Sequence, residues 1–63
     1  MTFIRVTDMG GHEMYLNVHQ IVTIEGEDQC TRVDLAVESK GDRSLHVRER
    51  PEDILTLIRI ATK

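Results

Sequence analysis

The sequence predicts a small α+β domain in which about five antiparallel β-strands, forming a small twisted sheet or an open barrel, precede one C-terminal α-helix. Between residues 2 and 49, apolar and polar residues alternate in successive segments, and glycines or polar bends separate these segments. After Pro51 the apolar spacing changes to that of a helix. A chain of 63 residues can hold one hydrophobic core, so we treat residues 1–63 as a single domain.

Residues 2–8 and 13–18 are expected to form a β-hairpin. Ile4 and Val6 share one face of the first segment, as alternation along a strand requires. Gly10 and Gly11 interrupt the alternation, and paired glycines accept the positive φ of a tight turn without steric cost. The second strand has one apolar face, formed by Met14, Leu16 and Val18. Residues 17–20 fit neither period, so we expect a short turn or a single 3₁₀ turn there.

Three further strands are expected at residues 21–25, 30–37 and 43–49. The middle one alternates most clearly, and its apolar face consists of Thr31, Val33, Leu35 and Val37. The acidic bend at residues 26–29 ends the third strand, and the polar segment at residues 38–42 forms the tip of a second hairpin. In the last strand Leu45 and Val47 face inward. We therefore expect Leu35 and Val47 to lie in the core and to face the helix.

The helix is expected over residues 51–61. Pro51 suits the first helical position, because its missing N–H would have no partner there. Glu52 and Asp53 place negative charge at the positive end of the helix dipole. Arg50 precedes the helix, and its side chain cannot accept a hydrogen bond from the amides of the first turn. We expect a helix without a side-chain N-cap, which a serine in place of Arg50 would supply with a gain in stability.

The apolar surface of this helix exceeds what one sheet face can cover. At about 100° per residue its apolar side chains spread over about 220°, whereas a one-sided surface helix needs a stripe of about 100° or more. The stripe expected to pack on the sheet consists of Ile54, Leu57, Ile58 and Ala61. Leu55 and Ile60 are left on opposite flanks. We predict a homodimer or a larger closed assembly in which Leu55, Ile60 or Leu57 contacts a second chain. Unpaired strand edges are the alternative interface, and a monomer is the competing interpretation.

Composition and charge exclude other classes of partner. The net charge is −3, and Phe3 and Tyr15 are the two aromatic residues, so the chain lacks the basic stripe and the stacking surfaces that nucleic-acid binding requires. Acidic residues interrupt the basic set, which consists of Lys40, Arg43, Arg48 and Arg50. A dimer would place two copies of this basic set on one assembly. The alternative function is therefore that of a small nucleic-acid-associated regulator. The sequence has no apolar run long enough for a membrane span and no signal peptide, so we expect a cytoplasmic protein with reduced Cys30.

Metal binding is not predicted by the spacing of candidate ligands. The available soft ligands are His12, His19, Cys30 and His46. They fall on different elements without the short spacing of a zinc site, so we expect exposed or edge histidines. The candidate oxygen ligands for a hard cation are Glu25, Glu27 and Asp28. These lack the alternating spacing of a calcium loop, and a solvated acidic bend is the expected outcome.

A catalytic site is not predicted either. Cys30 or Ser44 could act as a nucleophile beside His46, but the sequence supplies no third orienting group and no glycine-built oxyanion site. We therefore expect a protein without enzyme activity, cofactor or metal.

One pattern extends over essentially the whole chain. It comprises Gly11, Leu16-Asn17, Ile21, Ile24-Glu25, Thr31, Val33, Leu35, Val47-Arg48-Glu49, Glu52-Asp53-Ile54 and Ile58. With this pattern the chain resembles the flagellar FlbD family of small bacterial proteins, also called SwrD in swarming motility. The chain differs from the usual pattern at Arg50, where a serine is common, at Leu57, where a charged residue is common, and in the longer turn at residues 38–42. The resemblance implies a non-enzymatic protein of flagellar function without cofactor or catalytic residues. We therefore expect a self-associating protein-interaction module that binds another protein, such as one of the flagellar motor, with an orphan scaffold as an alternative.

Overall fold

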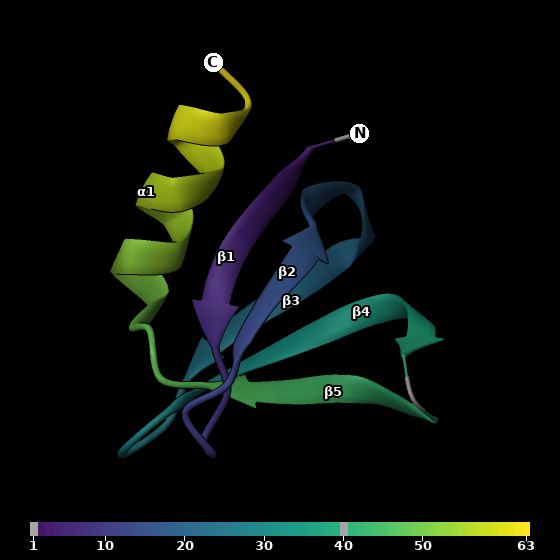
Figure 1. The fold of residues 1–63 in the computed structure, drawn as a ribbon, viewed down its shortest axis with the longest axis vertical. Coiled ribbons are helices and arrows are strands. Elements are labelled where there is room, and N and C mark those ends of the chain that lie inside the picture. Colours follow the sequence, from purple (N-terminus) through teal and green to yellow (C-terminus); the bar gives the residue numbers. More distant parts are fainter. Residues whose placement is uncertain (1, 40) are drawn as a thin grey trace.

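The computed structural model describes residues 2–39 and 41–63 (Figure 1). The elements in chain order are β1 (Phe3–Thr7), β2 (Glu13–Asn17), the 3₁₀ helix η1 (Val18–Gln20), β3 (Ile21–Gly26), β4 (Thr31–Ser39), β5 (Asp42–Val47) and α1 (Pro51–Ala61). Five antiparallel strands followed by one C-terminal helix confirm the predicted α+β class. Lys40, in the predicted tip of the second hairpin, lies outside the described residues.

The strands pair in two sheets. β1 and β2 form an antiparallel pair in which Ile4 lies opposite Leu16, and β4 is the central strand of the three-stranded sheet β3-β4-β5. The sheets meet where Asp8 forms a bridge to Val47. Figure 1 shows this junction, where β1 and β5 end beside the link to α1. The two sheets thus enclose one core.

The first turn and η1 form as the local sequence predicts. Gly11 has φ of 88°, a conformation that glycine adopts without strain. The Asp8 carboxylate Oδ1 accepts hydrogen bonds from the backbone N–H groups of Gly10 (2.9 Å) and His12 (2.8 Å). Asn17 begins η1, and its side-chain oxygen accepts the N–H of His19 at 3.0 Å. Short polar side chains therefore fix both connections.

Buried apolar side chains from both sheets and the helix form the core. In the described part of the chain they are Ile4, Val6, Leu16, Val33, Leu35, Val47 and Ile54. The burial of Leu35 and Val47 in one cluster with Ile54 of the helix confirms their predicted place in the core. Val37, expected on the same face, is instead 54% exposed. The reason is an irregularity between Asp34 and Ser39 that shifts the register of β4 against β5.

α1 begins at Pro51, and none of its first-turn N–H groups donates a hydrogen bond to the Arg50 side chain, as expected. The helix lies beside β1 (Figure 1) and buries Ile54 completely. Leu57 and Ile58 are half-buried against the core. Ala61, expected to pack on the sheet, is exposed, because residues 59–61 form a last turn that extends past the core. Within residues 2–39 and 41–63, no helix combines the length and the apolar character needed to cross a membrane.

Candidate functional site

Two regions of the surface are candidates for function, and the first is the pair of flanks of α1. Leu55 is 57% exposed and Ile60 is 66% exposed, so both leave most of an apolar side chain in solvent. Leu57, the third interface candidate, instead packs against the core. The outer face of the β1–β2 pair adds two exposed aromatic side chains, those of Phe3 (48%) and Tyr15 (66%).

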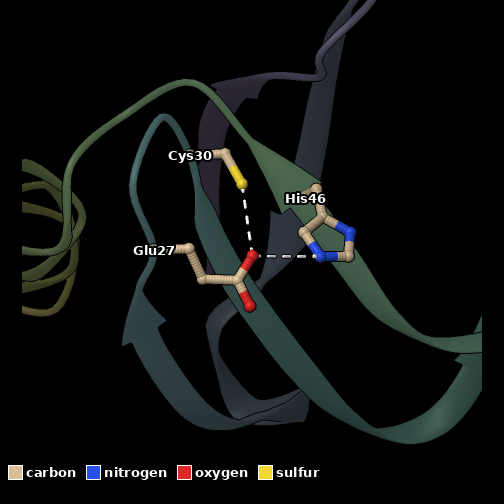
Figure 2. A group of neighbouring side chains, drawn as sticks. All are labelled: Glu27, Cys30 and His46. Carbon is tan, nitrogen blue, oxygen red and sulfur yellow. Dashed lines mark hydrogen bonds and ion pairs between the residues drawn. The ribbon is translucent and has the colours of Figure 1, made fainter.

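The second region is a cluster of three side chains from two separate segments (Figure 2). Glu27 and Cys30 lie in the bend between β3 and β4, and His46 lies on β5. The Cys30 Sγ is 3.4 Å from Glu27 Oε1, and the His46 Nε2 is 3.5 Å from the same oxygen. The candidate ligand atoms of the three residues all lie within 4.8 Å of one another. A carboxylate oxygen thus stands between a thiol and an imidazole.

Backbone hydrogen bonds and Arg50 hold the bend in place. The Glu27 N–H donates to the Cys30 carbonyl at 2.8 Å, which closes a tight loop. The Arg50 Nη1 donates to the carbonyl oxygens of both Glu27 and Cys30, each at 3.1 Å. Because Arg50 directly precedes α1, these bonds fix the bend to the start of the helix. Gly26 allows this close approach, since a Cβ there would lie 3.1 Å from the Pro51 Cγ.

An arginine on β4 orders the neighbouring carboxylates. Arg32 forms ion pairs with Glu25 and, through Nε, with Asp34 at 3.4 Å. Its Nη1 lies 3.9 Å from the Oε2 of Glu27. Arg32 is the register partner of His46, so it lies beside the cluster on the same three strands. The two oxygens of Glu27 therefore have different neighbours: Oε2 faces Arg32, and Oε1 faces Cys30 and His46.

The cluster does not match an activated nucleophile. Desolvation raises the pKa of the Cys30 thiol, and the hydrogen bond to Glu27 and its negative charge raise it further, against a smaller lowering by Arg50. A thiol that donates to a carboxylate keeps its proton. Cysteine nucleophiles need the imidazole next to the sulfur, with the acid on the far side of the imidazole. In this cluster the Glu27 carboxylate lies between the thiol and the imidazole. The other candidate nucleophile, Ser44, donates its hydroxyl hydrogen bond to Asp34 at 2.7 Å.

Comparisons with family models, curated proteins and solved structures found no match. The function of the chain must therefore be argued from its own residues and their geometry.

The structure combines residues that the sequence had placed in separate candidate sets. Cys30 and His46 come from the soft-ligand set, and Glu27 comes from the acidic bend. His12 lies instead beside Asp8, with Nδ1 and Oδ1 3.5 Å apart, and His19 is exposed on η1. No local spacing connects residue 46 with residues 27 and 30, because the connection is made by strand pairing.

Two arginines of the basic set have structural contacts. Arg48 Nη2 donates to the Met9 carbonyl at 3.0 Å, and Arg50 holds the bend described above. Arg43 is exposed on β5. Sequence reasoning missed both contacts, because each joins segments far apart in the chain.

Proposed function

We propose that this chain is a non-enzymatic protein-interaction module that associates with a second copy of itself through α1. The observation that carries the proposal is the exposure of Leu55 and Ile60 on opposite flanks of α1. The face of the helix between these flanks already packs against the core through Ile54, Leu57 and Ile58. Burying an exposed leucine or isoleucine contributes about 1.5–3 kcal/mol. A symmetric interface would bury each flank residue twice, once in each protomer.

The size of the core favours a partner of this kind. A single small core supplies little net stability in a chain this short, and small domains commonly rely on disulfides, metals or oligomerisation. The chain has one cysteine, so an internal disulfide cannot form. Packing two copies along α1 would bury apolar surface of Leu55 and Ile60 that the monomer leaves exposed, without a change of fold.

The resemblance to the FlbD family supports a cytoplasmic role in flagellar function, with a protein of the flagellar motor as a second partner. Deleting the gene and measuring swarming and swimming tests this part separately. A deletion strain with normal motility would contradict the flagellar role but not the self-association.

A nucleic-acid-associated regulator is less well supported. Arg48 and Arg50 already donate hydrogen bonds to backbone carbonyls, so they have fewer donors for phosphates. Acidic side chains also neighbour Arg32, which pairs with Glu25 of the adjacent strand β3 and with Asp34 of its own strand β4.

Light scattering coupled to size-exclusion chromatography tests the self-association with Leu55→Glu and Ile60→Glu. The parent chain is expected to elute at the mass of a dimer or larger closed assembly, and both variants at a lower mass with an unchanged circular dichroism spectrum. His19→Glu is the control, since it adds one negative charge at an exposed position of η1, outside α1, and should keep the parent mass. A monomeric parent chain would refute the proposal. If the parent assembles and both flank variants keep its mass, α1 is not the interface.

A further inference from the structure

We propose that Glu27, Cys30 and His46 form a binding site for a divalent cation of the zinc class. The ligands are the carboxylate Oε1, the Cys30 Sγ as thiolate and an imidazole nitrogen of His46. None of these residues lies on the helix flanks, so the site is independent of the proposed self-association.

The donor set selects the class of metal. Calcium and magnesium bind sites built from oxygen ligands, which a thiol and an imidazole do not provide. Zinc binds sulfur, nitrogen and carboxylate oxygen, and three protein ligands with one open position are typical of its accessible sites. A thiolate and a carboxylate together carry two negative charges, which balance a dication.

The separations of the side chains agree with tetrahedral coordination. With Zn–S of about 2.3 Å and Zn–N and Zn–O of about 2.0–2.2 Å, the ligand atoms of a tetrahedral zinc ion lie about 3.4–3.6 Å apart. The Sγ to Oε1 distance is 3.4 Å and the Nε2 to Oε1 distance is 3.5 Å. The remaining sulfur-to-nitrogen separation does not exceed 4.8 Å. This upper limit exceeds the tetrahedral separation of about 3.6 Å by about 1.2 Å, and rotation of the half-exposed His46 ring can bring its nitrogen closer to the sulfur by that amount.

Neighbouring groups hold the ligands in this arrangement. Arg32 faces Oε2 of Glu27, which leaves Oε1 directed toward Cys30 and His46 (Figure 2). Arg50 holds the carbonyls of Glu27 and Cys30. Such outer contacts orient metal ligands and reduce the reorganisation that binding requires.

The site is open to solvent on one side. The side chains of Glu27 and His46 are 39% and 48% exposed, and Glu27 and Cys30 line an open hollow together with Asp28 and Gln29. A cation can therefore enter without unfolding the bend, and water can take the fourth position. On binding, Cys30 releases its thiol proton to solvent, because the thiolate is the form that binds metal.

Titration of the reduced protein tests the site, with ZnCl₂ followed by calorimetry and CoCl₂ by absorption. We expect one ion per chain and a thiolate-to-cobalt charge-transfer band in the near ultraviolet. Cys30→Ser should remove the band, and Glu27→Gln and His46→Gln should each weaken zinc binding by about tenfold or more. His19→Gln, a histidine outside the cluster, is the matched control and should bind like the parent chain.

The proposal is overturned by the absence of saturable zinc binding, by a cobalt complex without the thiolate band, or by parental affinity in His46→Gln. Circular dichroism of each metal-free variant separates loss of a ligand from loss of fold. If His46→Gln is unfolded, His46→Asn replaces it in the same comparison, and parental affinity in that variant overturns the proposal equally.

Discussion

Replacing Arg50 by serine sets two local effects against each other. Serine would supply the missing N-cap of α1, a change that contributes about 0.5–2 kcal/mol. The same substitution removes the Arg50 hydrogen bonds to the Glu27 and Cys30 carbonyls, one of which is partly buried. Hydrogen bonds from a charged donor contribute about 1.5–3 kcal/mol each, and the exposed one contributes the least. We expect Arg50→Ser to lower the free energy of unfolding by about 1–3 kcal/mol, the opposite sign to that expected from the capping argument alone.

Thermal unfolding followed by circular dichroism measures this balance, with a shift of about 4–8 °C for each kcal/mol in a domain of this size. Arg50→Ala removes the same hydrogen bonds without adding a cap, so it should be about 1 kcal/mol less stable than Arg50→Ser. Arg43→Ser, at an exposed arginine of β5, is the control and should change stability by less than about 0.5 kcal/mol. An Arg50→Ser variant as stable as the parent chain would refute the reasoning, because the two carbonyl contacts would then contribute nothing beyond the cap.

Three further substitutions test the core and the first turn. Leu35→Ala should lower the free energy of unfolding by about 2–5 kcal/mol in a denaturant titration, and a loss below about 0.5 kcal/mol would contradict the register of β4. Thr31→Val should raise the melting temperature and the free energy of unfolding, the latter by about 1–2 kcal/mol, because the buried Thr31 hydroxyl has no hydrogen-bond partner among the described residues. An unchanged or lower melting temperature would mean that the Thr31 hydroxyl does have a hydrogen-bond partner. The pKa of Asp8 lies below its ordinary value of 3.8, mainly because its carboxylate accepts the hydrogen bond from the His12 N–H. The ionised carboxylate therefore stabilises the fold above pH 3.8, and this stabilisation is lost as the pH falls through the lowered pKa. A carbon-detected NMR titration should place the Asp8 midpoint below 3.8, and Asp8→Asn should lose this part of the acid sensitivity; a midpoint at or above 3.8 would contradict the turn geometry.

The secondary structure could be predicted because its signals are local. Gly10 and Gly11 mark the first turn, Asn17 marks η1 and Pro51 marks the start of α1, each within a few residues of the feature it predicts. Alternation also placed the core residues of β1 correctly. The exposure of Ala61 could not be read in the same way, since it depends on how far α1 extends past the sheets.

The Glu27–Cys30–His46 cluster depends on a register that the sequence does not show. Between Ser39↔Asp42 and Asp34↔Ser44, β4 advances five residues while β5 advances two. A hairpin that continued without interruption from the Ser39↔Asp42 pair would place His46 opposite Leu35. The irregularity places His46 opposite Arg32 instead, about 10 Å nearer to the bend. The hydrogen bonds of Arg50 could not be predicted from the sequence either. Both acceptors are backbone carbonyl oxygens, which every residue type has, so no residue pattern indicates them.

The junction between β1 and β5 constrains the order in which the chain folds. Asp8 bridges Val47, the Arg48 N–H donates to the Thr7 carbonyl at 2.8 Å, and the Thr7 N–H donates to the Glu49 carboxylate at 2.8 Å. A two-stranded hairpin such as β1–β2 is marginal alone in water, and contacts between distant segments form late because closing a long loop costs entropy. On the ribosome, the first hairpin would therefore wait for β5 and the first turn of α1 before its apolar face is covered. The apolar face of the β1–β2 hairpin is therefore covered by segments that are synthesised after it.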